Sequence, residues 1–251
     1  MNTSHNFYSL ITALFSLLLI IYIFDINTSL FLILNHTAQY IPITCWGYIT
    51  YLGDGMAAGC ILAIIFRKKP HVALMGIMAV LISGTIVQIL KDFFSLQRPA
   101  GILELNQFYQ LGEIFTSRSF PSGHSATAFS LFGTLMYSQN NNKMLFIGLA
   151  LLIAFSRIAI GMHWPMDILS GAIIGITTTY LLSRKLKDNV VENRLQLATA
   201  IFLSLICISA LFYNAHIPKI QILQWGLSAA GIICIISKFY TEYKIKNNIN
   251  Y

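Results

Sequence analysis

A histidine and a carboxylate stand close together in a part of the sequence where ionisable residues are otherwise rare. His163 and Asp167 are four residues apart, and Pro165 between them favours the first turn of a helix, so their side chains are expected on one face. A carboxylate on one ring nitrogen fixes the tautomer and leaves the other nitrogen as a base or nucleophile. The alternative interpretation is a membrane-buried His–Asp pair that serves structure alone.

A second histidine follows a helix-start sequence. Residues 119–124 read SFPSGH and directly precede an apolar run. Pro121 and Ser122 favour a helix start, and Gly123 permits close approach of the backbone, so amide groups would point at a guest beside His124. An anion is the natural guest at such a helix N-terminus. The alternative interpretation is a plain helix cap with a histidine beside it.

Three cations accompany the histidines. Lys91 and Arg98 lie about two helical turns apart, and Arg157 precedes His163 by five intervening residues. Either of the first two cations can instead be a snorkelling residue at a helix end. Three fixed charges against the one carboxylate call for a polyanion, which a phosphate dianion supplies. The same cations would repel a divalent metal ion, and one carboxylate beside two histidines is a poor ligand set, so we expect no metal and no other cofactor.

The elements that must position these residues are membrane helices. Of 251 residues, 56% are hydrophobic and 10% are charged, against about 25% charged in soluble domains, which excludes an ordinary soluble enzyme. We predict an all-α polytopic membrane helix bundle that forms a single integral membrane domain over residues 1–251, with about eight spans and a range of six to eight. The predicted spans are residues 8–24, 46–66, 71–90, 123–137, 144–160, 166–182, 197–213 and 222–238.

The distribution of cations predicts an orientation. With the N-terminus in the cytoplasm, the cytoplasmic loops and the C-terminus hold eleven of the sixteen Lys and Arg residues, which satisfies the positive-inside rule. The net charge of +7 is therefore a topology signal, and no nucleic-acid partner is expected. The first run ends in Asp25 and lacks a basic leader, so we interpret it as a retained helix. The chemistry-bearing residues then face the outside.

The three clusters together resemble the motifs of the type 2 phosphatidic acid phosphatase family, membrane lipid phosphatases related to bacterial acid phosphatases and vanadium haloperoxidases. All three motifs occur in the family's order and spacing, within about residues 46–182. The resemblance implies a six-helix phosphatase core over that range. The C-terminal helix pair at about residues 197–238 goes beyond it, and its role is left open.

The resemblance also implies a role for each motif residue. His163 would be the nucleophile that forms a phosphohistidine, Asp167 would orient it, and His124 would protonate the leaving oxygen and then help to activate water. The scheme requires no metal. The groups that would hold the phosphoryl oxygens are Lys91, Arg98, Arg157 and the backbone at Ser122 and Gly123.

The substrate implied is a phosphomonoester or pyrophosphate of a membrane lipid. Undecaprenyl pyrophosphate, phosphatidic acid, phosphatidylglycerophosphate and the lipid A phosphates all fit, and selectivity is expected in the loop at residues 101–120. The setting is a bacterial plasma membrane with the active site on the periplasmic or outer face, and no obligatory protein partner is evident. The alternatives are a lipid phosphotransferase that uses the same phosphohistidine, or an anion or lipid transporter that uses the cationic cluster.

Three other polar residues fall outside the motifs. Asp54, between two glycines in the second predicted span, either lines the substrate cavity or is paired within the bundle. Asn27 and Asn35 match the Asn-x-Ser/Thr acceptor pattern for glycosylation.

Overall fold

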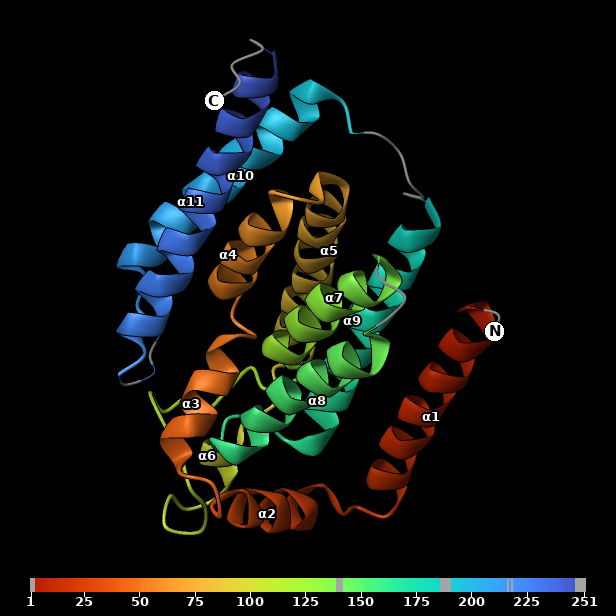
Figure 1. Cartoon of the computed structure of the whole chain (residues 1–251). Coiled ribbons are helices and arrows are strands. Elements are labelled where there is room, and N and C mark those ends of the chain that lie inside the picture. The colour runs from red at the N-terminus through yellow and green to blue at the C-terminus, as the bar shows by residue number, and fades with distance from the viewer. Residues whose placement is uncertain (1–2, 139–141, 186–190, 216, 218, 247–251) are drawn as a thin grey trace.

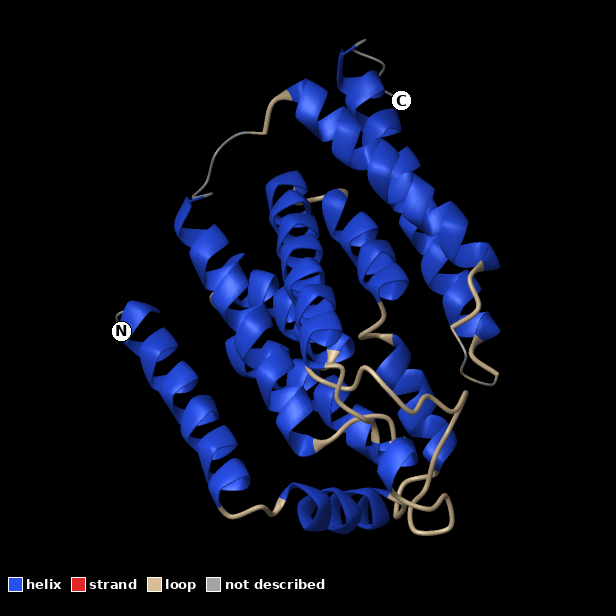
Figure 2. Ribbon diagram, turned by 180° about the vertical axis from the view of Figure 1, so that it is seen from behind, coloured by secondary structure: helices blue, strands red, loops and turns tan. Residues whose placement is uncertain are grey.

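The computed structural model describes residues 3–138, 142–185, 191–215, 217 and 219–246, and these residues form helices and loops without a strand (Figures 1 and 2). The all-α prediction is confirmed. The helices are α1 (Thr3–Ile23), α2 (Asn27–Ala38), α3 (Ile43–Tyr51), α4 (Gly55–Phe66), α5 (Pro70–Phe94), α6 (Pro99–Ile102), α7 (Gly123–Ser138), α8 (Lys143–Ala159), α9 (Pro165–Lys185), α10 (Asn193–Phe212) and α11 (Gln221–Lys246).

Each of the eight predicted apolar runs falls on helical structure, but the number of membrane crossings stays a prediction. Four helices of the described chain are long and apolar enough to cross a membrane, and this number rises to six if each of two bent helix pairs forms one span. Helices α7 and α8 have 16 and 17 residues, somewhat short of a full crossing.

Two features of the helices go beyond the predicted spans. The run at residues 46–66 is a pair of helices, α3 and α4, bent by 58° at residues 52–54. Asp54 adopts an extended conformation there and its side chain accepts a hydrogen bond from the amide of Met56, so it starts α4 anew as an N-cap. Helix α2 lies between the first two predicted spans, forms an angle of 110° with α1 and, with 12 residues, is too short to span a membrane alone.

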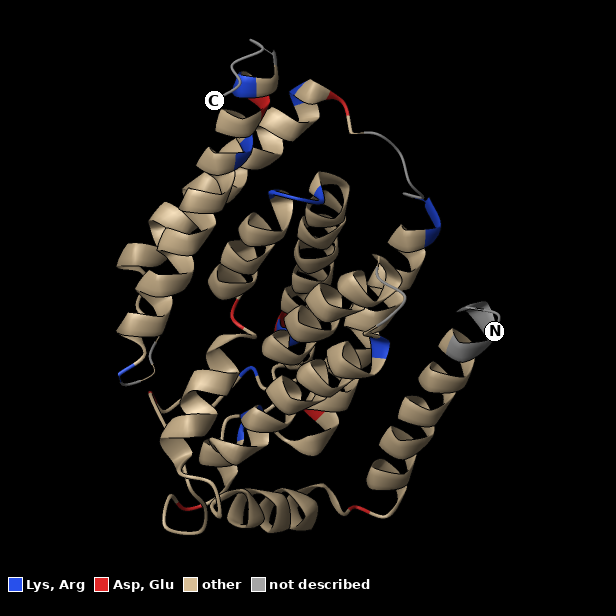
Figure 3. Ribbon diagram, viewed as in Figure 1, with Lys and Arg blue, Asp and Glu red and all other residues tan. Residues whose placement is uncertain are grey.

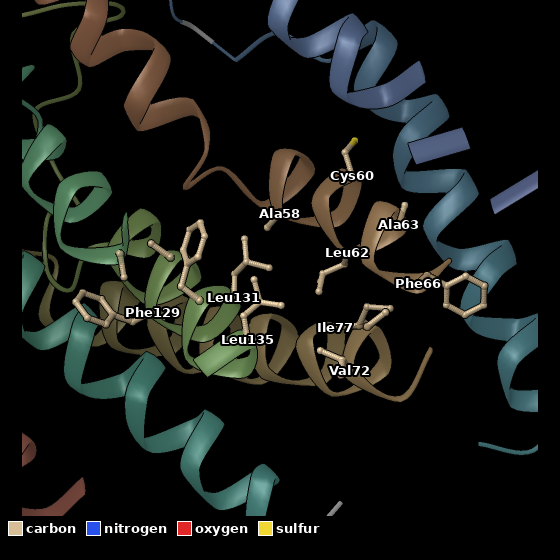
Figure 4. Packing of buried hydrophobic residues seen from close by; sticks show 14 of the residues in the cluster. Ala58, Cys60, Leu62, Ala63, Phe66, Val72, Ile77, Phe129, Leu131 and Leu135 are labelled. Carbon is tan, nitrogen blue, oxygen red and sulfur yellow. The ribbon is translucent and has the colours of Figure 1, made fainter. Parts of the chain in front are cut away.

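Helix α7 lies at the centre of the bundle and packs against α5, α8 and α9 (Figure 1). Gly171 of α9 faces the start of α7 so closely that a Cβ there would lie 2.4 Å from the carbonyl oxygen of Ser122. On another side, Leu131 and Leu135 of α7 point toward the hydrophobic residues of α4 and α5 (Figure 4). This packing brings the N-terminal ends of α7 and α9 together.

The C-terminal pair, α10 and α11, packs against α4 on the side of the bundle away from α1 (Figure 1). Its buried residues Leu203, Cys207 and Ile235 join the same hydrophobic cluster as α4. The pair is therefore attached through α4, and the domain division predicted from the sequence stays a prediction.

The charged segments are distributed unevenly along the bundle. Figure 3 shows basic segments toward one end of the bundle, where α4 leads into α5, at the end of α9 and at the start of α10, whereas α2 and the two acidic loops beside it lie toward the other end; further acidic segments stand before α10 and near the C-terminus. The positive-inside interpretation requires such a separation. Lys187, one of the cations that it invokes, lies outside the described residues.

Candidate active site

The turn from α8 into α9 ties Arg157 to His163. The carbonyl oxygen of Arg157 accepts hydrogen bonds from the amides of Met162 and His163, at 2.9 and 3.2 Å. Gly161 has φ +75°, and a Cβ at this position would lie 2.6 Å from the carbonyl oxygen of Tyr109, so the turn requires glycine. The local backbone therefore delivers both side chains to one place.

The predicted pair of His163 and Asp167 is present. His163 is 1% exposed and Asp167 is 2% exposed. A distance of 3.1 Å separates Nδ1 of His163 from Oδ2 of Asp167. The same carboxylate oxygen accepts hydrogen bonds from the Ser119 hydroxyl at 2.5 Å and from the Trp164 amide at 2.9 Å. Because a carboxylate accepts, Nδ1 carries the proton and Nε2 is the nitrogen left for chemistry.

The surroundings of His163 favour its neutral form. Burial is the main cause that holds the pKa of His163 well below its usual range, and the positive charges of Arg98, Lys91 and Arg157 act in the same direction. A neutral imidazole with one fixed tautomer is the form that can act as a nucleophile.

The start of α7 places His124 near this pair. Gly123 and His124 are partly exposed, and His124 is close enough to His163 to interact with it electrostatically. The backbone and Cβ of His124 also lie against Gly53, where an added Cβ would approach them to 3.2 and 3.3 Å. The second histidine is thus held between α9 and the break between α3 and α4.

The backbone and side chain of Ser122 make hydrogen bonds at the start of α7. Its amide donates a hydrogen bond of 3.0 Å to the carbonyl oxygen of Asp167, and its hydroxyl accepts one of 3.4 Å from the amide of Ser125. The Ser122 amide therefore joins α7 to α9, and the predicted role of Ser122 and Gly123 in binding phosphate stays a prediction.

Two of the three cations hold the loop that precedes α7. The ammonium of Lys91 donates hydrogen bonds to the carbonyl oxygens of Arg118 and Ser119, at 2.5 and 3.0 Å. Arg98 donates through Nε to the Ser117 carbonyl oxygen at 3.0 Å and through Nη1 to Met162 at 3.3 Å. These bonds connect the first motif to the other two and place both charges beside His163.

Arg157 retains unused hydrogen-bonding capacity. It is 6% exposed, and its Nη1 donates a hydrogen bond of 2.8 Å to the hydroxyl of Thr50. Its Nε is buried and has no hydrogen-bond partner among the described residues. A buried guanidinium with an unsatisfied donor is a suitable group to receive an oxyanion.

Sequence reasoning missed three residues that build the site. Ser119 bonds to Asp167, and Thr50 bonds to Arg157, but neither has a spacing signal because its partner is distant in the sequence. Asn35 is fully buried, and its side chain bonds to the backbone of Tyr109 and Ile158 at 2.8–2.9 Å. Although Asn35 matches the acceptor pattern for glycosylation, burial and these bonds make its amide inaccessible.

Two further expectations concern Asp54 and a metal site. Asp54 is 9% exposed and bonds to Met56 and to the Tyr213 hydroxyl, as expected for a residue paired within the bundle. The described residues contain no group of three or more His, Cys, Asp or Glu side chains that could hold a metal ion. The absence of a metal requirement stays a prediction.

The amino-acid sequence is similar to those of known membrane phosphatases. Residues 72–191 match the PAP2 superfamily. An undecaprenyl-diphosphatase of Sulfolobus acidocaldarius is 26% identical over 122 residues, which make up 48% of this chain and 58% of the relative. A lipid A 1-phosphatase of Rhizobium etli is 29% identical over 104 residues, 38% of this chain and 42% of the relative. The matches thus span about half the length of these curated relatives.

A solved structure extends the likeness to the fold. The crystal structure of Aquifex aeolicus LpxE aligns with a TM-score of 0.59 and 30% identity, covering 63% of this chain and 95% of that one. Almost the whole of that chain is therefore represented here, and about a third of the present chain lies outside the alignment.

Proposed function

We propose that this chain, which belongs to the PAP2 superfamily, is a phosphatase of membrane lipids. The observation that carries the proposal is the buried His163–Asp167 pair beside His124, surrounded by Lys91 and two arginines. Structure alone does not require a histidine with a fixed tautomer next to an unsatisfied guanidinium. Phosphoryl transfer through a histidine nucleophile uses both, the first to attack phosphorus and the second to bind the phosphoryl oxygens.

The proposed reaction has two steps. Nε2 of His163 attacks phosphorus, the bond from phosphorus to the leaving oxygen breaks, and His124 gives that oxygen a proton. A phosphohistidine results. His124, now neutral, takes a proton from water as the water oxygen attacks phosphorus, which breaks the P–N bond and releases phosphate and free His163. Asp167 keeps Nδ1 of His163 protonated in both steps and stabilises the positive ring.

The cations and the α7 start serve the transferred group. Arg157 would satisfy its buried Nε with a phosphoryl oxygen, while Arg98, Lys91 and the Gly123 amide add positive potential on the other oxygens. Because these donors are already held by backbone carbonyls or by Thr50, little reorganisation accompanies the reaction. Such preorganised charge is often the largest contribution to catalysis of this kind.

The protein is a multi-pass membrane protein, and its location in a lipid bilayer supports a membrane lipid as the substrate. The motifs lie at helix ends, where a phosphate group on a lipid would be found, and the relatives named above act on an undecaprenyl diphosphate and on lipid A. We therefore assign this chain a lipid phosphomonoester or pyrophosphate. The separation of basic segments in Figure 3 supports a site on the extracytoplasmic face of a bacterial plasma membrane.

The test is phosphate release by detergent-purified protein from a panel of lipid phosphates and pyrophosphates in the presence of EDTA. Wild type is compared with His163→Ala and with His36→Ala, a matched control because His36 lies on α2, where its ring bonds to the carbonyl oxygen of Gln107 and packs against Tyr109. We expect release that survives EDTA, vanishes in His163→Ala and is retained in His36→Ala. Equal release by His163→Ala and wild type would overturn the assignment. Labelled phosphate that appears on a second lipid instead of in solution would favour the phosphotransferase.

A further inference from the structure

The break between α3 and α4 contacts the active site at two points. Thr50, at the end of α3, accepts the hydrogen bond from Arg157, with 2.8 Å between Oγ1 and Nη1. Gly53, within the break, lies against the backbone and Cβ of His124. The conformation of residues 50–54 therefore affects a proposed phosphate-binding residue and a proposed general acid at once.

Asp54 fixes this break through both of its carboxylate oxygens. Oδ1 accepts a hydrogen bond of 2.7 Å from the Met56 amide and caps α4. Oδ2 accepts a hydrogen bond of 3.2 Å from the hydroxyl of Tyr213. The Asp54 carboxylate is 159 residues from Tyr213 in the sequence, so the bond reports a long-range arrangement.

Tyr213 is anchored at the end of α10. The Gln224 side chain on α11 bonds to the carbonyl oxygens of Ala210 and Tyr213, which ties the two helices together next to the tyrosine. Ile217 and Ile220, in the turn between these helices, are buried against Tyr51 of α3. A tyrosine hydroxyl is protonated at neutral pH, so Tyr213 can donate the hydrogen bond to Asp54.

Asp54 is also an anionic neighbour of Arg157. The two side chains interact electrostatically, and the residues are only 9% and 6% exposed. A buried guanidinium is costly without a compensating charge, and it is free to turn unless its bonds hold it. Thr50 accepts a hydrogen bond from Arg157. Asp54 places a negative charge near Arg157, and hydrogen bonds to both carboxylate oxygens hold that charge in place.

We propose that Asp54 is a positioning residue for Arg157, and that Tyr213, by holding Asp54, makes the α10–α11 pair a functional part of the active site. The proposal rests on the proposed phosphatase function. It gives the C-terminal pair a task beyond packing on α4: the pair fixes the direction in which Arg157 meets the phosphoryl group.

The test compares three purified variants with wild type in the phosphate-release assay. Asp54→Asn retains the N-cap, because asparagine caps helices as well as aspartate does, and it removes the charge and the oxygen that accepts from Tyr213, whose hydroxyl can then only accept from the new amide nitrogen. Tyr213→Phe removes one hydroxyl. Tyr48→Phe is the matched control, because the Tyr48 hydroxyl also joins α3 to the α10–α11 turn, through the Lys219 carbonyl at 3.0 Å, but does not contact the site.

The expected result is a loss confined to turnover. Loss of an interaction with a charged group predicts that kcat falls about tenfold in Asp54→Asn and about threefold in Tyr213→Phe. KM should change by less than about twofold in both, and Tyr48→Phe should match wild type. Wild-type kcat in Asp54→Asn and Tyr213→Phe at normal folded yield would overturn the proposal. If Asp54→Asn does not fold, Tyr213→Phe decides the matter alone.

A double-mutant cycle distinguishes positioning from a general structural role. In an Arg157→Lys background, Asp54→Asn should lower kcat by less than about twofold, because the group through which it acts has already changed. A full tenfold loss in that background would show that Asp54 acts elsewhere, and it would overturn the inference.

Failure of the proposed function can be told apart from failure of this inference. If wild type releases no phosphate from any lipid, the phosphatase assignment fails, and the inference is tested by the rise in melting temperature that inorganic phosphate produces in wild type and in Asp54→Asn. A smaller rise in the variant would support positioning of Arg157 toward an anion. An equal rise would overturn it. If wild type is active and the variants are equally active, only the inference fails.

Discussion

The two sides of the candidate site are built in different ways. The His163 side is largely local: the histidine and its carboxylate partner are four residues apart, in one helix start. The Arg157 side is assembled from distant segments, because Thr50 is 107 residues from Arg157 and Asp54 is 159 residues from Tyr213. The proposed nucleophile is thus oriented largely within a single turn of chain, whereas Arg157, which we propose to bind phosphate, depends on segments that come together only when helices pack.

This difference separates two kinds of defect. Damage to the local side should remove chemistry and leave the fold intact, because the catalytic contact lies within one element. Damage to the assembled side should change stability or turnover according to how many segments the altered residue joins. Four substitutions or measurements test this division, in decreasing order of expected effect.

The largest effect is expected for Asp167→Asn. An amide can hold Nδ1 of His163 in the wrong tautomer and cannot balance a positive ring, so kcat should fall by about 10²–10⁴-fold. Phosphate release with the preferred lipid, measured at equal folded protein, checks this. A loss below about threefold, with the hydrogen bonds from Ser119 and Trp164 still available to the amide oxygen, would contradict the local account of the nucleophile.

The next effect is a change in the free energy of unfolding. It concerns Asn35, which belongs to the assembled side because it bonds to the carbonyl oxygen of Ile158, next to Arg157. Asn35→Ala leaves the part-buried amide of Tyr109 without its partner, at a cost of about 1–3 kcal/mol, and it removes one of the two bonds to the Ile158 carbonyl oxygen, which keeps the bond from the Gly161 amide. A lower melting temperature in detergent should result. Asn27→Ala is the control, because Asn27 accepts a single bond of 3.2 Å from the Met166 amide and should cost less. Equal melting temperatures for the two variants would remove Asn35 from the assembled side.

The same division explains what the sequence could predict. The apolar runs, the His163–Asp167 spacing and the helix start before His124 depend on local patterns, and the structure brings these residues together as helix geometry requires. Asn35, Thr50 and Ser119 have no such pattern, because each meets its partner only after helices pack. The break at Asp54 does have a local signal, because a helix-capping residue between two glycines favours an interruption of a helix. The continuous hydrophobicity of residues 46–66 favours one uninterrupted span instead.

A smaller effect is expected where the two sides meet, at Ser119. Its hydroxyl donates to Asp167 from the loop that Lys91 holds, so Ser119→Ala should lower kcat by about tenfold, in keeping with one hydrogen bond to a charged group. Ser125→Ala is a matched control, because the Ser125 hydroxyl also joins α7 to α9, through the Ile168 carbonyl at 2.6 Å, without contact to Asp167. Similar kcat values for the two variants would show that the bond to Asp167 has no special weight.

The smallest effect is a pH shift that links the two sides. Burial and nearby cations lower the pKa of His163. The midpoint of the acid limb in the pH profile of kcat/KM should therefore lie below the ordinary histidine pKa of about 6.5, and activity should be lost as pH drops through the lowered pKa. Asp54→Asn removes a negative charge and leaves Arg157 less compensated, and both changes disfavour protonation of His163. For charges about 10 Å apart in a water-like dielectric, the acid limb should move down by about 0.3 pH unit. A limb that moves up, or that moves equally in Tyr48→Phe, would mean that the charge of the assembled side does not reach the nucleophile.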